Sequence, residues 1–215
     1  LPFFCTCGVG FDAFVSLKFA DSGKRGLLTY LENTLHESLT YKPETYEIEN
    51  EEGTQRYNAF LIACGNASQY GNNAYITPQA SLTDGLMDVT IMEPFTVLDV
   101  PSLSFQLFNK TLDQNSRIKT FRARKIKIHR TKPGVLHYDG DPVMADENLE
   151  VEIIPGGLYV IASDKKKVKQ ENVNLLQVIS DYFSGLHLKG EEMLARRQSH
   201  LFELNRSLLG KLSKK

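Results

Sequence analysis

Short apolar segments separated by glycine-containing turns are the feature that most constrains the fold of this chain. Residues 59–64 and 157–162 are apolar runs of strand length, while residues 125–129 and 149–153 alternate apolar with charged side chains. Both patterns are typical of β-strands. The turn signals between these segments are Glu52-Gly53, Asp84-Gly85, Pro133-Gly134, Asp139-Gly140 and Pro155-Gly156. Together they predict a β-sandwich or barrel-like domain.

Two segments have helical rather than strand periodicity. Leucines recur at three- and four-residue spacing from residue 27 to residue 39, and Pro43 ends that pattern because proline is excluded from helix interiors. Residues 97–108 are a second helix candidate, with Thr96 at the N-cap. The sequence therefore predicts a mainly β fold with α additions.

Charge and periodicity both change near residue 164. Residues 1–163 carry 14 basic and 20 acidic side chains, whereas residues 164–215 carry 11 and 6. Apolar stripes at 175–186 and 194–208 predict two helices. We expect a β-sandwich domain over residues 1–163 and a helical tail over residues 164–215. The tail would pack on that domain, on a second subunit of a homodimer or on a missing N-terminal domain.

The balance of charge narrows the classes of function. A net charge of −1 provides no global field that would recruit nucleic acid. Three cysteines without zinc spacing favour reduced thiols, and no apolar run reaches the about 20 residues that span a bilayer. We therefore expect a cytoplasmic protein. A lysine-rich run at residues 165–169 is interpreted as a solvated linker, or alternatively as a contact with an anionic membrane surface.

The start of the chain suggests a fragment. Leu1 opens directly into an apolar segment, without the lead-in that usually precedes a core strand. We expect that an upstream half is missing.

Three glycine-containing loops are candidate sites, and each also has a purely structural interpretation. The Gly8-Val9-Gly10 turn can present N–H groups to a phosphate, or it can allow close packing of a strand on a helix. Asp84 can give an oxygen to a hard cation, or it can form a turn. The segment Asp139-Gly140-Asp141 can hold a metal or accept a proton, but Asp-Gly is also favoured in hairpin turns. Spacing alone favours the structural interpretation of each loop.

Other chemistry has less support in the sequence. His129 and His137 lack the spacing of zinc ligands, and there is no Gly-x-Ser-x-Gly nucleophile elbow. Cys5 and Cys7 are expected to be core residues rather than catalytic thiols. These observations argue against a zinc enzyme and against a serine hydrolase.

Four sequence blocks, in this order, resemble the C-terminal half of the diacylglycerol kinase and sphingosine kinase family, most closely its bacterial members. The blocks are Gly8 to Ala13, Gly65 to Gly71, Pro78 to Val89 and Asp139 to Pro142. The resemblance covers roughly residues 3–162 and implies a two-sheet β-sandwich. It also implies an N-terminal domain with a Gly-Gly-Asp-Gly-Thr nucleotide signature, which this chain does not contain.

The resemblance implies a metal site and a catalytic acid. A structural Mg²⁺ would be bound by the carbonyl oxygens of Ser81 and Leu86 and by the side chain of Asp84. The glutamate that accepts the proton in this family falls on Asp141, whose side chain is one methylene shorter. Because displacements of about 1 Å can change rates about 100-fold, the shorter arm matters for this role.

The resemblance further implies the substrate-side domain of an ATP- and Mg²⁺-dependent kinase that phosphorylates a lipid alcohol such as diacylglycerol. ATP would lie against the missing nucleotide-binding domain, next to Asp139 and Gly140, so this chain alone is expected to be inactive. Contact with the inner membrane surface would be peripheral. Two alternatives stay open: a NAD-kinase-like enzyme with a non-lipid hydroxyl substrate, and a non-catalytic β-sandwich binding module.

Overall fold

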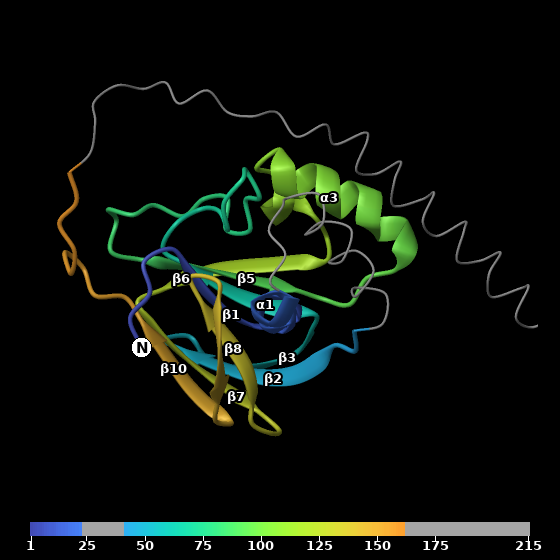
Figure 1. Ribbon diagram of the computed structural model, residues 1–215, viewed down its shortest axis with the longest axis horizontal. Coiled ribbons are helices and arrows are strands. Elements are labelled where there is room, and N and C mark those ends of the chain that lie inside the picture. The colour runs from blue at the N-terminus through green and yellow to red at the C-terminus, as the bar shows by residue number, and fades with distance from the viewer. Residues whose placement is uncertain (23–40, 162–215) are drawn as a thin grey trace, which may run out of the picture. The chain divides into compact units, whose positions relative to one another are not determined.

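Ten strands form two antiparallel sheets in residues 1–22 and 41–161, the part of the chain that the computed structural model describes (Figure 1). Sheet A has the strand order β6-β5-β4-β1-β8-β9, and sheet B has the order β10-β7-β2-β3. The strands are β1 (Thr6–Gly10), β2 (Glu44–Asn50), β3 (Gly53–Ala59), β4 (Leu61–Gly65), β5 (Met87–Met92), β6 (Ile118–Ala123), β7 (Lys125–Arg130), β8 (Gly134–Tyr138), β9 (Asp141–Ala145) and β10 (Asn148–Glu152). The predicted mainly β, two-sheet fold is confirmed.

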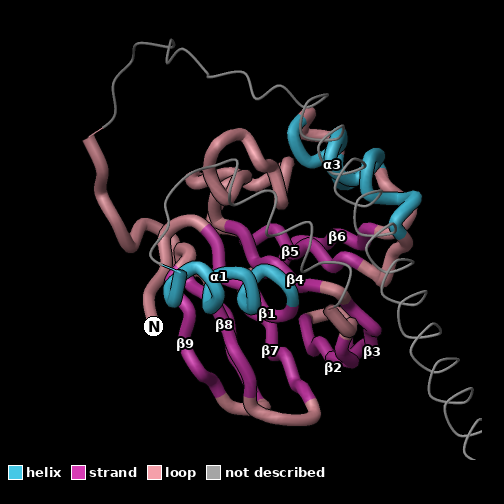
Figure 2. The backbone as a smooth tube through the Cα atoms, turned by 45° about the vertical axis from the view of Figure 1, so that its right-hand side comes forward, coloured by secondary structure: helices cyan, strands magenta, loops and turns pink. Residues whose placement is uncertain are grey.

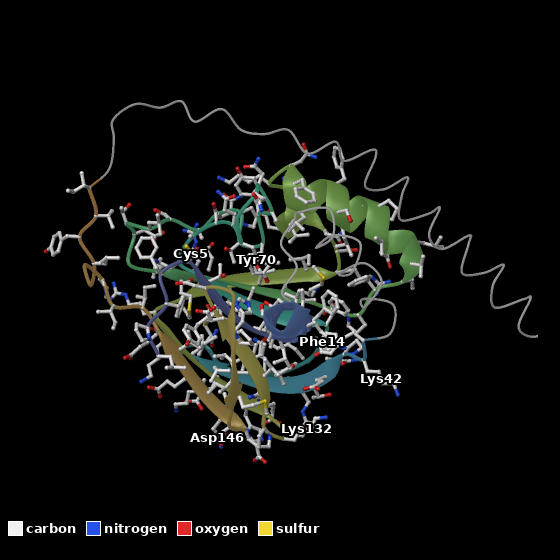
Figure 3. All side chains as sticks on the ribbon, viewed as in Figure 1. Cys5, Phe14, Lys42, Tyr70, Lys132 and Asp146 are labelled. Carbon is white, nitrogen blue, oxygen red and sulfur yellow. The ribbon has the colours of Figure 1, made fainter. Side chains whose placement is uncertain are left out.

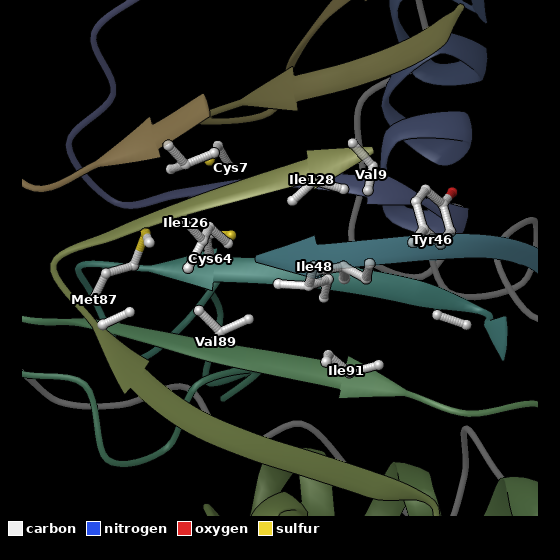
Figure 4. Close-up of a cluster of buried hydrophobic side chains, with 14 residues drawn as sticks. Cys7, Val9, Tyr46, Ile48, Cys64, Met87, Val89, Ile91, Ile126 and Ile128 are labelled. Atoms are coloured by element: carbon white, nitrogen blue, oxygen red, sulfur yellow. The ribbon is translucent and has the colours of Figure 1, made fainter. Parts of the chain in front are cut away.

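The main hydrophobic core lies between the two sheets and is formed by inward-facing side chains from both of them (Figure 4). In β7, Ile126 and Ile128 are buried while Lys125 and Lys127 are exposed, as the alternating sequence predicts. Ile126 lies opposite Val151 of β10, which is also buried. Each fully buried aliphatic side chain of this kind contributes about 1.5–3 kcal/mol. Alternation therefore identifies two of the four strands of sheet B, β7 and β10, but not β3, which is exposed at five of its seven positions.

A second core covers the opposite face of sheet A. Helices α1 (Phe11–Ser22) and α3 (Val100–Phe108) pack here, together with the short 3₁₀ helices η1 (Val97–Asp99) and η2 (Leu112–Gln114) (Figure 2). Because both faces of sheet A are covered, β1, β4 and β5 are buried at every position. Their sequences consequently read as continuous runs rather than alternating ones.

The predicted apolar strand at residues 59–64 is divided at Phe60. Ala59 ends β3 in sheet B, and Leu61 begins β4 in sheet A, so the chain changes sheets between them. Phe60 is held at this corner because its N–H donates to the carbonyl of Met92 at 2.7 Å. The predicted buried strand is confirmed from Leu61 onward as β4, but its predicted start at Ala59 was wrong, since the break depends on pairing with a distant segment.

The helix predicted at residues 97–108 is confirmed as η1 followed by α3. The N–H and Oγ1 of Thr96 both donate to the Asp99 carboxylate, at 2.8 and 2.9 Å, and so fix the start of the segment. Among the described residues, no helix is long and apolar enough to cross a bilayer. The predicted helix at residues 27–39 and the tail at residues 164–215 lie outside the described residues, and the boundary at 163 stays a prediction.

The strand predicted at residues 157–162 was wrong for the residues that are described. Residues 157–161 form no strand, and Tyr159 is 95% exposed. A buried strand needs a neighbouring strand edge for its backbone N–H and C=O groups, and no ladder includes this segment. Apolar composition alone is therefore not sufficient to predict a strand here.

Candidate functional site

Both predicted acidic loops lie at the same edge of sheet A. Gly65 at the end of β4 pairs with Thr6 at the start of β1 and with Asp88 at the start of β5, and Cys7 pairs with Tyr138 at the end of β8. The loop before β5 and the turn after β8 therefore meet this edge. Three strand spacings of about 4.8 Å separate β5 from β8, about 14 Å in all. The two loops share an edge, but they are too far apart to bind one ion together.

The Asp139-Gly140 segment is the hairpin turn between β8 and β9. Both residues have positive φ, 48° for Asp139 and 91° for Gly140, as a two-residue hairpin turn requires. The Asp139 carboxylate accepts hydrogen bonds from the N–H groups of Phe4, Cys5 and Thr6 at 2.6, 2.7 and 2.9 Å. This carboxylate consequently anchors the segment that leads into β1. Contact of Asp139 and Gly140 with a nucleotide stays a prediction.

Asp141 is the first residue of β9 and is exposed. It pairs with Tyr138, which packs against the core between the sheets, whereas the next pair, His137 with Pro142, lies on the opposite face of sheet A. Residues paired across two strands share a face. Asp141 is therefore placed on a different face from the polar groups around His137.

The loop with the predicted cation ligands is compact and faces outward. Asp84 is exposed, and its Oδ1 accepts the N–H of Leu86 at 3.0 Å, which curls the loop around the carboxylate. The Ser81 and Thr83 hydroxyls lie 3.4 Å apart. Gly85 has a φ of 71°, which favours glycine at the turn. One carboxylate among backbone carbonyls is a donor set that suits Mg²⁺ or Ca²⁺.

A metal site built from side chains alone is not found in the described ranges. No group of three or more His, Cys, Asp or Glu side chains within residues 1–22 and 41–161 is arranged to hold a metal ion. A hard cation on the loop would therefore depend on backbone carbonyls for part of its coordination. Binding by Ser81, Asp84 and Leu86 stays a prediction.

Asp88 lies directly beyond this loop and carries an unsatisfied oxygen. Its Oδ1 accepts a hydrogen bond from Nε of Arg122 at 3.3 Å, while its Oδ2 is buried and has no hydrogen-bond partner. Burial raises the pKa of Asp88, the Arg122 guanidinium lowers it, and the charge of Asp84 raises it again, with a net upward shift. The carboxylate is thus incompletely compensated by its neighbours.

A third polar cluster, which the sequence did not predict, joins Asp12, Tyr70 and His137. Nε2 of His137 lies 3.0 Å from Oδ2 of Asp12, and the Tyr70 hydroxyl donates to the same oxygen at 2.8 Å. Tyr70, labelled in Figure 3, comes from the loop that follows β4. Gly8 of β1 lies against the Asp12 carboxylate, and a Cβ on this glycine would overlap Oδ2 of Asp12. The one sequence feature that could have indicated this cluster is Asp12, which follows the Gly8-Val9-Gly10 segment by two residues.

The electrostatics of His137 follow from its burial beside a carboxylate. The residue is 2% exposed, and its Nδ1 is buried without a hydrogen-bond partner. Burial lowers the pKa of His137. The negative charge of Asp12 and the hydrogen bond between the two side chains raise this pKa by a larger amount, so the net shift is upward. Asp12 therefore makes protonation of His137 more favourable than it is for an ordinary histidine.

Gly8, Val9 and Gly10 are the last three residues of strand β1 and not a separate turn, and α1 begins at the next residue. Gly10 has a φ of 98°, and the first N–H of α1, from Phe11, donates to the carbonyl of Phe60 at 2.9 Å. That N–H is used within the fold. The structure thus agrees with the packing interpretation of the two glycines, since a Cβ on either would lie closer than 3.0 Å to neighbouring atoms.

A family model and the curated relatives of this chain indicate the same protein family. A family model described as the YegS C-terminal NAD kinase beta sandwich-like domain matches residues 5–162. A "Probable lipid kinase YegS" of Salmonella arizonae is 28% identical over 151 residues, which are 69% of this chain and 49% of that protein. A "Probable lipid kinase YegS-like" protein of Shewanella frigidimarina is 24% identical over 128 residues, 59% of this chain and 40% of that protein. The chain thus spans about half the length of the curated relatives it matches.

One solved structure supports the same fold. A Bacillus anthracis str. Sterne protein, named a "putative diacylglycerol kinase", aligns with a TM-score of 0.51 over 72% of this chain and 50% of that chain. The two sequences are 16% identical. At this identity the likeness concerns the fold alone.

Proposed function

Because the chain belongs to the YegS C-terminal NAD kinase beta sandwich-like domain family, whose curated relatives are named probable lipid kinases, we propose that it is the substrate-side domain of a kinase of a lipid hydroxyl. The phosphoryl donor would be ATP with Mg²⁺, and diacylglycerol is the model acceptor. The observation that carries this proposal is the placement of both acidic loops, before β5 and after β8, at one edge of sheet A.

Phosphoryl transfer depends mainly on positioning and on electrostatic stabilisation. In the proposed reaction, Asp141 accepts a hydrogen bond from the acceptor hydroxyl and receives its proton as the phosphoryl group is transferred. Its exposed position at the start of β9 leaves the carboxylate accessible to a substrate. Asp139 contributes indirectly, because its bonds to residues 4–6 hold the hairpin that carries Asp141.

The loop before β5 is the proposed cation site. Asp84 would bind through its side chain, and Ser81 and Leu86 would bind through their carbonyl oxygens. The donor set fits a hard divalent cation, since it consists of oxygens only. When bound, such an ion would have a structural role, because it would hold the carboxylate of Asp84 and the backbone of the loop together.

The proposed reaction also needs a nucleotide-binding domain in addition to residues 5–162. ATP would lie against the turn at Gly140, where a Cβ built on the glycine meets no atom within 4 Å. This open surface is compatible with the approach of a second domain. The membrane would be contacted only peripherally while the lipid alcohol enters.

A substrate panel tests this function. The longest natural polypeptide that contains this chain would be incubated with labelled ATP, Mg²⁺ and mixed vesicles that contain diacylglycerol, monoacylglycerol or sphingosine. NAD would serve as the non-lipid acceptor. Transfer to one lipid alcohol but not to NAD is expected. Transfer to NAD alone would favour the NAD-kinase-like alternative, and no transfer to any acceptor would favour a binding module.

A further inference from the structure

We propose that Cys7 and Cys64 form a redox-sensitive thiol pair, which a hydroperoxide oxidises to a disulfide between strands β1 and β4 and which a dithiol restores. The two residues lie directly opposite each other in the ladder between these strands. Strands β1 and β4 are the two central strands of sheet A. The pair takes no part in the proposed phosphoryl transfer, so it is a modification site additional to that function.

The first observation is the register of the two strands. Cys7 pairs with Cys64, and Figure 4 shows both side chains in the core between the sheets. The N–H of Asn66 donates to the carbonyl of Cys5 at 2.9 Å. In an antiparallel ladder, every second pair of opposite residues is hydrogen-bonded. Cys7 and Cys64 lie two residues further along each strand and are therefore also a hydrogen-bonded pair.

The second observation is the separation that this register imposes. The Cα atoms of a hydrogen-bonded pair are about 5.5 Å apart, within the range of about 4.4–6.8 Å that disulfides span. The two Cβ atoms lie on the same face of the sheet at up to about 5.5 Å, whereas a disulfide holds them at about 3.5–4.5 Å. A disulfide can therefore form after a small approach of the two strands. The resulting bond is strained, and strained disulfides are readily reduced.

The third observation is that the two thiols already interact. The hydrogen bond with the Cys7 thiol and burial raise the pKa of the Cys64 thiol well above its ordinary value. Cys64 is completely buried, while Cys7 is 4% exposed. Oxidation of the folded protein therefore depends on brief local opening of the sheet, and Cys7 is the more accessible of the two sulfurs.

The proposed oxidation has two steps. The Cys7 sulfur attacks one oxygen of hydrogen peroxide and the O–O bond breaks, which gives a sulfenic acid on Cys7 and one molecule of water. The Cys64 sulfur then displaces the hydroxyl of the sulfenic acid, which leaves as water with the thiol proton of Cys64, and the S–S bond forms. Two thiols thus lose two electrons and two protons, and the peroxide becomes two molecules of water. A dithiol reverses the change by thiol–disulfide exchange and is itself oxidised.

Cys5 is the third cysteine of the chain and provides an internal comparison. It is half-buried just before β1, and the residue opposite it is Asn66 rather than a cysteine. Burial and the negative charge of Asp139 raise the pKa of the Cys5 thiol, which lowers its thiolate fraction. We therefore expect Cys5 to stay outside the disulfide.

The position of the pair connects its redox state to the candidate site. Cys64 also pairs with Val89 of β5, and Cys7 also pairs with Tyr138 of β8. An approach of β1 to β4 changes the spacing between the strands that lead to the loop before β5 and to the turn after β8. Oxidation is therefore expected to lower the rate of phosphoryl transfer, and this effect alone rests on the proposed function.

The test is treatment of the folded 215-residue chain with hydrogen peroxide, followed by alkylation in denaturant and mass spectrometry. The number of alkylated cysteines in wild type should fall from three to one, and the mapped disulfide should join residues 7 and 64. Dithiothreitol should restore all three thiols. Cys5→Ala should form the same disulfide, whereas Cys7→Ala and Cys64→Ala should form none.

The mapping in wild type decides the question even where an alanine variant does not fold. Three free thiols in the folded chain, under conditions that oxidise the same chain in urea, would overturn the proposal. A disulfide that includes Cys5, within one chain or between two, would also overturn it.

Activity is measured separately, in the longest natural polypeptide that contains this chain. Peroxide should lower the rate of transfer to diacylglycerol several-fold in wild type, reversibly with dithiothreitol, but not in Cys64→Ala. Equal losses in both would refute the connection to the site. Because disulfide mapping needs no kinase activity, failure of the proposed function and failure of this inference are distinguishable.

Discussion

His137 and Asp12 form a buried hydrogen-bonded pair that links β8 to the first turn of α1. Nε2 of His137 lies 3.0 Å from Oδ2 of Asp12, and the two side chains are 3% and 8% exposed. The pair sits directly on the backbone of Gly8, where no Cβ fits. Tyr70 bonds to the same Asp12 oxygen and so connects the loop after β4 to the pair. Residues from four segments are thereby fixed around one carboxylate.

The first prediction concerns the pH dependence of folding. Burial lowers the pKa of His137, but Asp12 raises it more, so the folded-state pKa lies above the ordinary value of about 6.5. A group with a raised folded pKa stabilises the fold fully below its unfolded pKa, and this contribution is lost as pH rises through the folded pKa. The free energy of unfolding should therefore fall as pH increases above about 6.5.

Urea unfolding at several pH values, with NMR of the imidazole ring, checks this prediction. His137→Asn should remove this part of the pH dependence. His129→Asn, which replaces a histidine on the exposed face of β7, should retain it. A His137 ring that titrates at or below the ordinary histidine value would show that the pair is not charged.

The second prediction compares two glycines that have no room for a side chain. The three atoms nearest to a Cβ on Gly65 all belong to the Thr77 side chain, whereas a Cβ on Gly8 would also lie 2.9 Å from the backbone carbonyl oxygen of Ile62. Each Gly→Ala change should destabilise the fold by about 1–3 kcal/mol. Because a side chain can be truncated and a backbone carbonyl cannot, Thr77→Ala should partly rescue Gly65→Ala, while Asp12→Ala should not rescue Gly8→Ala.

Double-mutant cycles measured by chemical denaturation check this difference. The coupling between residues 65 and 77 should be favourable by at least about 0.5 kcal/mol. Thr77→Ala alone should cost about 1 kcal/mol, since its hydroxyl donates to the carbonyl of Ala67 at 2.8 Å. Strictly additive costs at residues 65 and 77 would mean that the overlap is relieved elsewhere.

The third prediction concerns Arg130, which is 3% exposed at the end of β7. Its guanidinium donates, at 2.7–3.1 Å, to the carbonyls of Gly134, Val135, Ala145 and Asp146. Arg130→Met would leave these acceptors unsatisfied and should destabilise the fold by at least about 3 kcal/mol. Arg130→Lys should also be strongly destabilising, because an ammonium cannot reproduce the planar fork.

Denaturant unfolding of both Arg130 variants checks this expectation. Arg56→Met is the control, because the Arg56 side chain is 72% exposed and its pairing with Glu47 should contribute at most about 1 kcal/mol. Equal costs at Arg130 and Arg56 would refute a structural role for the buried guanidinium.

Local sequence signals predicted the strands that have one solvated face and the turns that need positive φ. The alternation in residues 125–129 correctly predicts a strand because sheet B exposes its outer face. The Asp139-Gly140 pair correctly predicts a turn because the two-residue hairpin has positive φ values, 48° and 91°, at these residues. The break at Phe60 could not be predicted, since it depends on a hydrogen bond to Met92. The run at residues 157–161 was misassigned because composition does not show whether a strand edge is available.

The sequence predicted the loop before β5 and the turn after β8 as two separate candidate sites, but not their arrangement in the fold. Register pairing of distant strands brings the acidic loops to one edge of sheet A, and no local pattern encodes that register. The Asp12–His137 contact joins residues 125 positions apart, so neither spacing nor periodicity indicates it. Likewise, Asp139 was recognised as a turn residue, but its bonds to residues 4–6 span more than 130 positions.

The most direct test of the proposed function is the rate of phosphoryl transfer to diacylglycerol in variants of Asp141. In the longest natural polypeptide that contains this chain, Asp141→Asn should lower kcat at least about 100-fold with unchanged thermal stability. Asp141→Glu should retain activity, and Asp146→Asn, at an exposed residue just beyond the other end of β9, should behave as wild type. Wild-type kcat in Asp141→Asn would contradict the assignment of this carboxylate as the proton acceptor.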